Sequence, residues 1–146
     1  MLVAGEWKLR DDGVLRPIVR ARVLGSDGSL VAEDFLIDSG ADRTALSATL
    51  LARLPLLAQN VQPGFSLSGI GGTTAFVSVT TALEFIRDDG GLARVRGAFA
   101  GFTDPTATDL SILGRDVLDH FDVIISRQRG AIWLLAPRHQ YRIGRV

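Results

Sequence analysis

Short hydrophobic runs separated by polar turns make up most of the chain and predict a mostly β structure. The runs are rich in Val, Ile, Leu, Phe and Ala, and several alternate with polar residues, as half-buried strands do. Turn signals recur between them, at Asp12-Gly13, Asp27-Gly28, Asp89-Gly90-Gly91 and Arg129-Gly130. Glycine is favoured in such turns because it adopts positive φ angles at little steric cost. The pattern therefore predicts a series of hairpins.

The predicted hairpins account for most of the sequence. They pair residues 17–24 with 30–37, turn at 68–72 and at 88–91 within a strand-like region over 65–102, and pair 121–125 with 131–135. No linker, repeat or low-complexity block interrupts the pattern. We therefore expect one domain over residues 1–146, of the all-β class, that closes on itself as a small β-barrel.

One or two short helices are expected between the strands. Residues 47–54 place three leucines at helical spacing, begin with Ser47 as a suitable N-cap, and stop before Pro55. A second helical turn is expected over residues 115–120. Neither segment is long enough to change the predicted class.

The composition is that of a globular protein. The chain has 146 residues, of which 47% are hydrophobic and 22% are charged, and its formal net charge is zero. Zero net charge disfavours nucleic acid or an anionic lipid surface as a partner.

No run approaches the roughly 18 to 20 apolar residues that span a bilayer, and the first residues do not resemble a signal peptide. We expect a cytoplasmic protein, although a soluble domain of a longer or anchored protein would have the same composition.

The sequence gives no indication of thiol or metal chemistry. It contains no cysteine, which excludes disulfides, thiolate catalysis and cysteine metal sites. Its two histidines, His120 and His139, are isolated from each other and from any acidic residue at ligand spacing. We expect no metal and no organic cofactor.

A carboxylate follows the hydrophobic run that ends at Ile37. Asp38 precedes Ser39, Gly40 and Ala41, so an ionisable group lies where a core strand turns a corner. Burial and neighbouring donors set the proton affinity of an acid in such a position, which is how carboxylates become catalytic. The alternative is a turn-forming aspartate, the usual role of an Asp-Ser-Gly tripeptide. Ser39 lacks the Gly-x-Ser-x-Gly sequence of a nucleophilic serine.

Two further segments favour the catalytic interpretation. They are Gly69-Ile70-Gly71-Gly72 at a hairpin tip, and Ile112-Leu113-Gly114-Arg115-Asp116-Val117-Leu118. In order and spacing, these segments and Asp38-Ser39-Gly40-Ala41 resemble the retroviral-type, or retropepsin-like, aspartic proteases, whose catalytic Asp-Thr/Ser-Gly-Ala, flap and Gly-Arg-Asn/Asp segments follow one another in this way. The resemblance extends from about Arg16 to Leu118, and more loosely through the final hairpin. We expect a bacterial, single-domain member of this family.

The resemblance implies a role for each residue of the catalytic segment. Asp38 would be the catalytic carboxylate, and Ser39 would brace the paired loop of a second subunit. Gly40 would let the substrate backbone approach closely. Arg115 would support the active loop by pairing with Asp42, in an ion pair partly shielded from water.

The resemblance also implies a substrate-binding surface. Its residues would be Gly40, Ala41, Asp42, Gly69, Ile70, Gly71, Leu110 and Ile112. Ile70 at the flap tip would offer its backbone N–H, through a water, to the carbonyls of the scissile peptide, while Leu110 and Ile112 would line apolar subsites. Arg16 matches a family arginine that reaches the equivalent of Asp42 in the other subunit.

The number of catalytic motifs implies a homodimer. Aspartic proteases use two carboxylates that share a proton, one activating water and the other supplying an acid. The sequence contains one Asp-Thr/Ser-Gly motif, so the dyad would consist of Asp38 from each of two copies across a two-fold axis. The substrate would be a peptide or protein segment. Two alternatives remain: a catalytically weak retropepsin-fold module for peptide binding or dimerisation, and a protease domain that works only within a longer protein or after self-cleavage.

Overall fold

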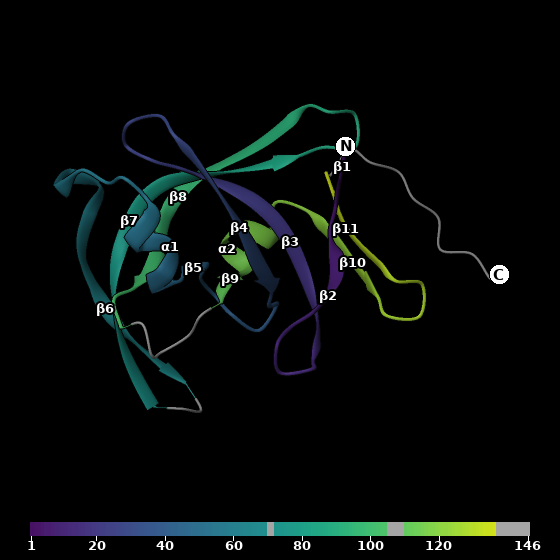
Figure 1. Ribbon diagram of the computed structural model, residues 1–146, viewed down its shortest axis with the longest axis horizontal. Helices are drawn as coiled ribbons and strands as arrows, with labels where there is room; N and C mark the ends of the chain where they lie inside the picture. The colour runs from purple at the N-terminus through teal and green to yellow at the C-terminus, as the bar shows by residue number, and fades with distance from the viewer. Residues whose placement is uncertain (70–71, 105–109, 137–146) are drawn as a thin grey trace.

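A computed structural model describes residues 1–69, 72–104 and 110–136, and over residues 64–69 and 72–75 it describes the backbone alone (Figure 1). Its strands are β1 (Leu2–Ala4), β2 (Glu6–Leu9), β3 (Leu15–Leu24), β4 (Leu30–Ile37), β5 (Ala45–Leu46), β6 (Val61–Gly69), β7 (Gly72–Ile86), β8 (Leu92–Phe102), β9 (Ser111–Leu113), β10 (Asp122–Ser126) and β11 (Ala131–Leu135). The helices are α1 (Ala48–Arg53), α2 (Arg115–Leu118) and the 3₁₀ turn η1 (Ala58–Asn60). The predicted all-β class with short helices is confirmed.

Six strands close into a barrel (Figure 1). In the eight-stranded sheet, neighbouring strands follow the order β2-β3-β4-β9-β5-β8-β7-β6. β3 also pairs with β7, where Val23 lies opposite Leu83, so the ring β3-β4-β9-β5-β8-β7 returns to its start. The pairs β3–β4 and β7–β8 are predicted hairpins, and Gly28 and Gly90 in their turns have φ angles of 84° and 80°. The predicted closed barrel is therefore confirmed.

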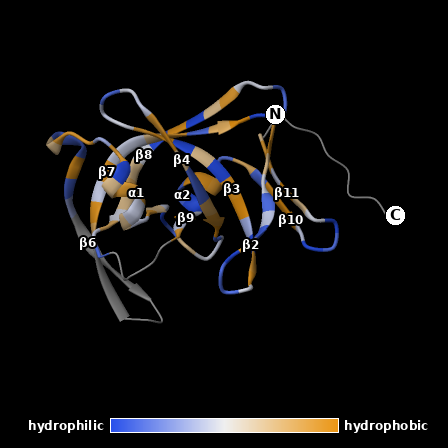
Figure 2. Cartoon of the chain, viewed as in Figure 1, coloured by the Kyte–Doolittle hydropathy of each residue, from blue (hydrophilic) through white to orange (hydrophobic). Residues whose placement is uncertain are grey.

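The barrel encloses the main hydrophobic core. Figure 2 shows hydrophobic and hydrophilic residues alternating along the long strands, as expected when one face of each strand is buried. The fully buried side chains include Phe35 on β4, Phe85 on β7 and Leu113 on β9. α1 adds the buried Leu50, whose N–H donates to the Oγ of Ser47 at 3.1 Å, so Ser47 is the predicted N-cap. The core thus fixes β4 and β9, the two strands that lead into the candidate site.

The second helix is shorter than predicted. We expected helical residues over 115–120, whereas α2 ends at Leu118. The N–H groups of His120 and Phe121 donate to the C=O groups of Val117 and Leu118, at 3.1 and 2.9 Å. Bonds between residues three apart belong to a tight turn rather than an α-helix, and this turn leads the chain into β10.

The terminal strands form a separate three-stranded sheet, ordered β1-β11-β10, beside the barrel (Figure 1). β10 and β11 are the predicted C-terminal hairpin, with Ile124 opposite Trp133. β1 pairs with the other edge of β11, with Val3 opposite Leu134. This third strand was not predicted, because residues 2–4 give a hydrophobic run too short to be recognised as a strand.

Candidate active site

Asp38 lies at the carboxyl end of β4, beside the parallel strand β9. Its N–H donates to the C=O of Leu113 at 3.1 Å. The chain then turns, and the N–H of Ala41 donates to the C=O of Asp38 at 3.1 Å. The N–H of Gly40 donates to Oδ1 of the Asp38 carboxylate at 3.0 Å. Asp38 is partly buried, whereas Ser39 and Gly40 are exposed, so the carboxylate has a fixed orientation next to solvent.

Gly40 leaves space beside this carboxylate. A Cβ built at Gly40 would lie 3.2 Å from Oδ1 of Asp38, closer than an ordinary van der Waals contact. A larger residue would therefore crowd the oxygen that the Gly40 N–H orients. The predicted approach of substrate to Gly40 and Ala41, and the predicted contact of Ser39 with a second subunit, stay predictions.

α2 holds the loop that follows Asp38. The N–H of Arg115 donates to the C=O of Ala41 at 2.8 Å, and the N–H of Asp116 donates to the C=O of Asp42 at 3.2 Å. The side chains of Arg115 and Asp42 form the predicted ion pair. However, these side chains are 53% and 78% exposed, so the expectation that the pair is partly shielded from water is wrong for the single chain. Both side chains lie on the surface of the subunit, where solvent weakens their attraction.

A second contact between the loop and α2 is partly buried. Oδ1 of Asp116 accepts hydrogen bonds from the N–H of Thr44 at 2.8 Å and from its Oγ1 at 2.7 Å. The same Oγ1 accepts the N–H of Gly114 at 3.0 Å, and Thr44 is fully buried. Sequence reasoning gave no role to Thr44 or Asp116. The sequence nevertheless contained an indication of this contact, because Asp116 belongs to the Gly-Arg-Asp segment and Thr44 closely follows Asp38.

Gly114 allows α2 to approach the loop. A Cβ built at Gly114 would lie 2.5 Å from the carbonyl carbon of Arg43 and 2.9 Å from the nitrogen of Thr44. These are main-chain atoms, which cannot rotate away as the end of a long side chain can. The glycine of the Gly-Arg-Asp segment is therefore required by packing.

Two residues predicted to line apolar subsites lie at β9. Ile112 is partly buried, opposite Leu36 of β4 and Ala45 of β5. Leu110, directly before β9, is also partly buried and lines a pocket with Arg16. Both residues lie close in sequence to Leu113, which bonds to Asp38, and their contact with substrate stays a prediction.

The predicted flap is the hairpin of β6 and β7. Gly69, the last residue of β6, pairs with Gly72, the first residue of β7. The predicted tip residues Ile70 and Gly71 lie outside the described residues. The hairpin itself is therefore as expected, whereas the substrate contacts of Gly69, Ile70 and Gly71 stay predictions.

Arg16 is paired within its own chain. Its Nη1 and Nη2 donate to Oδ1 and Oδ2 of Asp12, at 2.9 and 2.6 Å. The side-chain hydrogen bonds from Arg16, followed by the backbone N–H of Val14, lower the pKa of Asp12 from 3.8 to about 2. The predicted contact of Arg16 with a second subunit would therefore compete with an in-chain pair that persists in acid.

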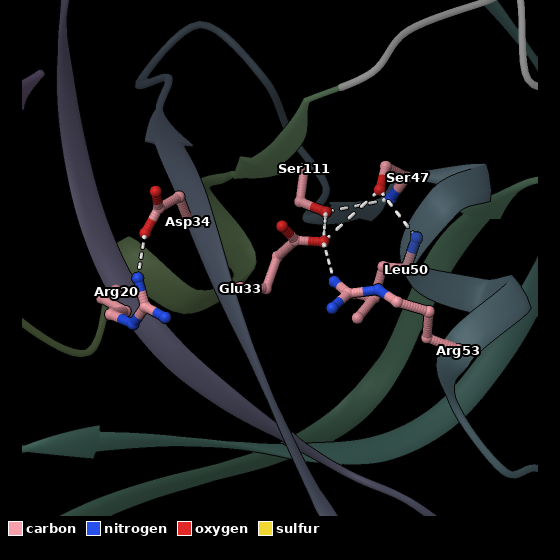
Figure 3. A network of polar contacts seen from close by, with 7 residues as sticks. All are labelled: Arg20, Glu33, Asp34, Ser47, Leu50, Arg53 and Ser111. Carbon is pink, nitrogen blue, oxygen red and sulfur yellow. Dashed lines mark hydrogen bonds and ion pairs between the residues drawn. The ribbon is translucent and has the colours of Figure 1, made fainter. Parts of the chain in front are cut away.

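A polar network joins β4, α1 and β9 (Figure 3). Oε2 of Glu33 accepts from the hydroxyls of Ser111 at 3.3 Å and Ser47 at 3.4 Å, and it lies 3.9 Å from Nη2 of Arg53. Oγ of Ser111 in turn accepts the N–H of Ser47 at 3.0 Å. Because Ser111 precedes Ile112, the network fixes the start of β9 against β4.

Two further features of the described chain bear on function. Its described residues include no group of three or more His, Cys, Asp or Glu side chains placed to hold a metal ion. Within the same ranges, no helix has the length and apolar character needed to cross a membrane.

A closed barrel with one carboxylate at the end of a barrel strand, followed by a loop that α2 holds, is the arrangement that the resemblance to the retropepsin-like proteases predicts. Residues 14–126 match a family model described as retroviral aspartyl protease. This match covers more than half of the chain, so the chain belongs to the retroviral aspartyl protease family. A comparison with curated proteins found no match.

Two solved structures share the fold. The EIAV protease, in complex with the inhibitor HBY-793, is 22% identical, with 71% of this chain and 86% of that chain covered and a TM-score of 0.52. A retropepsin-like aspartic protease from Rickettsia conorii is 16% identical, with 92% of this chain and 97% of that chain covered and a TM-score of 0.59. The predicted family and barrel are thereby confirmed.

Proposed function

We propose that this protein is an aspartic endopeptidase whose catalytic dyad is formed by Asp38 from each of two copies. The observation that carries the proposal is the placement of Asp38 at the end of a barrel strand, with its carboxylate oriented by the N–H of Gly40 at 3.0 Å. The bonds from α2 to the following loop support it, because catalysis needs a fixed carboxylate. Membership of the aspartyl protease family supports the same chemistry.

The dyad would hydrolyse a peptide bond by general acid–base catalysis. Two carboxylates held close together do not both ionise readily, so the pair retains one proton. The ionised carboxylate removes a proton from a water molecule, whose oxygen attacks the peptide carbonyl carbon, while the protonated carboxyl donates its proton to the carbonyl oxygen. A proton is then delivered to the peptide nitrogen, and the C–N bond breaks to leave a carboxylic acid and an amine.

The substrate would be an extended peptide lying between the dyad and the β6–β7 hairpins of the two copies. An extended chain can pair with neighbouring backbone in the manner of an added strand. The open space at Gly40 would admit its backbone, Ala41 and Asp42 would contact its main chain, and the N–H of Ile70 would approach its carbonyls through a water.

Cleavage of a peptide library, with products identified by mass spectrometry, tests the proposal. Asp38→Asn keeps the size of the side chain but removes its ionisation, so we expect a loss of kcat of about 10²-fold or more. Asp89→Asn, at a turn between β7 and β8, is the matched control and should retain activity. A statine-type transition-state mimic should inhibit the wild type. Full cleavage by Asp38→Asn would contradict the proposal, and peptide binding without any turnover by the wild type would favour a binding module.

A further inference from the structure

One edge of the barrel strand β8 has no backbone partner over its first half. β8 pairs with β7 along its whole length, whereas on its other side it pairs with β5 at Ala100 and Gly101 alone in the described chain. Residues 92–97 therefore form an open sheet edge within the part of the chain that the structure describes. Such an edge presents N–H and C=O groups that can pair with the backbone of another chain.

The ladder with β7 determines which backbone groups point outward from this edge. In an antiparallel ladder, alternate residues direct their N–H and C=O groups to the same side. The N–H of Ala100 points away from β7, because it donates to the C=O of Thr44 at 3.0 Å. Counting back in steps of two, the groups of Leu92, Arg94 and Arg96 point the same way. No hydrogen bond within the described residues uses them.

The open edge carries positive charge. Arg94 and Arg96 are two positions apart, so they share one face of the strand, and both are exposed. Arg94 pairs with Glu84, which is 1% exposed and pairs with Arg22 as well, so one carboxylate faces two guanidinium groups. Arg96 forms no ion pair among the described residues. The edge therefore has more cationic than anionic groups, although the chain as a whole has no net charge.

A groove beside this edge combines cationic and apolar side chains. The residues that line it include four consecutive positions of β8 and two of the turn after α2, which are Ala93, Arg94, Val95, Arg96, His120 and Phe121. No Asp or Glu is among its described lining residues. Ala93, Val95 and Phe121 also pack against the main core. Cationic and apolar positions therefore alternate along the edge, as a strand with a matching alternation requires.

We propose that this edge of β8 binds an extended, acidic segment of a partner protein, which joins the barrel sheet as an added strand. The backbone of the segment would pair with the outward groups of Leu92, Arg94 and Arg96. Its acidic side chains, two positions apart, would lie beside Arg94 and Arg96, and the apolar side chains between them would lie beside Ala93 and Val95. The edge takes no part in the proposed peptide cleavage, so this inference does not rest on it.

Fluorescence anisotropy tests the site with a defined probe, a fluorescein-labelled peptide of alternating Glu and Val. All proteins carry Asp38→Asn, so that the peptide stays intact. Arg96→Glu reverses an exposed charge that has no ion pair to lose, so the Kd should rise by about 5-fold or more. Arg129→Glu makes the same charge change at an exposed turn between β10 and β11, and as the matched control it should not change the Kd. Circular dichroism checks that both variants are folded.

The acidic character of the partner is tested by two further probes. A peptide of alternating Lys and Val should not bind, because its cations would lie beside the arginines. A short single-stranded DNA should bind less tightly than the Glu-Val peptide, since it has no peptide backbone to pair with the strand edge. Equally tight binding of the DNA would show a general attraction for anions and would overturn the proposal.

N-methylated peptides test the strand pairing itself. Only alternate residues of an added strand donate to the edge that it joins. Methylating the backbone nitrogens of either the Glu set or the Val set should therefore abolish binding, while methylating the other set should weaken it far less. Equal effects of the two sets overturn strand addition. No binding of the Glu-Val peptide, or an unchanged Kd for Arg96→Glu, also overturns the proposal and leaves the arginines as charges that keep the edge unpaired. None of these measurements depends on peptide cleavage, so a failure of the proposed function would not alter them.

Discussion

Thr44 donates two hydrogen bonds to one carboxylate oxygen of Asp116, from its N–H at 2.8 Å and from its Oγ1 at 2.7 Å. Thr44 is fully buried, and its Oγ1 also accepts the N–H of Gly114. One side chain of α2 therefore satisfies two buried donors of the loop that follows Asp38. This contact, more than the exposed pair of Arg115 and Asp42, holds the loop against the helix.

Asp116→Ala should destabilise the fold by about 1–3 kcal/mol, because it leaves two buried donors of Thr44 without their acceptor. Asp116→Asn retains a carbonyl oxygen at the same place, so its loss should be smaller. Chemical denaturation followed by tryptophan fluorescence measures both. Asp119→Ala, at an exposed position one turn on, is the control and should stay within about 0.5 kcal/mol of wild type. Equal stability of Asp116→Ala and wild type would show that the contact contributes nothing net.

The turn at Asp38 could be predicted from the sequence, because strand runs and glycine-containing turns are signalled by neighbouring residues. The contact of Thr44 with Asp116 could not, since it joins residues 72 positions apart and depends on how two elements pack. The same reason explains why the sequence did not predict the exposure of Asp42 in the single chain. Burial is set by the assembled surface, which no local pattern encodes. The register of β1 on β11 likewise depends on the packed barrel.

Gly114→Ala should cost about 1–3 kcal/mol of stability and reduce cleavage, because its Cβ would lie 2.5 Å from the carbonyl carbon of Arg43. Relief of the overlap requires the loop after Asp38 to move away from α2. Thermal unfolding and peptide cleavage, measured on the same preparation, check both effects. Gly91→Ala is the control, since a Cβ there meets only the side chains of Asp89 and Arg87, which can shift. A Gly114→Ala protein with unchanged stability would contradict the packing argument.

Arg16→Gln should raise the pKa of Asp12 from about 2 toward 3.8, because the hydrogen bonds from Arg16 are the largest cause of its low value. The pKa of Asp12 is lower in the folded protein than in the unfolded chain. The pair with Arg16 therefore stabilises the fold at pH values above the pKa of the unfolded chain. That contribution is lost as pH falls through about 2. Carboxyl ¹³C NMR titration measures the shift. Asp27, whose pKa is lowered by hydrogen bonds from Ser29, is the internal control and should titrate identically in both proteins.

Ser39→Ala should weaken the dimer if the hydroxyl braces the loop of the second copy. Two symmetric hydrogen bonds would be lost, each contributing about 0.5–1.5 kcal/mol, so the dimer dissociation constant should rise by about 5-fold to 100-fold. Ser39→Thr keeps the hydroxyl and should dimerise as the wild type does. Analytical ultracentrifugation of the three proteins at matched concentrations provides the measurement. Equal dissociation constants for Ser39→Ala and Ser39→Thr would remove this role from the hydroxyl.

The cleavage rate should show a bell-shaped dependence on pH with its maximum in the acidic range, because the two Asp38 carboxylates of the proposed dyad would have to share one proton to act. As pH falls, the second carboxylate also binds a proton and no base remains to activate water. As pH rises, both carboxylates ionise and no acid remains for the substrate carbonyl. The measurement is kcat/KM for one peptide across this range, with dimer content followed by sedimentation at each pH so that dissociation is not mistaken for titration. A rate that stays constant from acid through neutrality, in a protein that remains dimeric, would contradict the aspartyl mechanism.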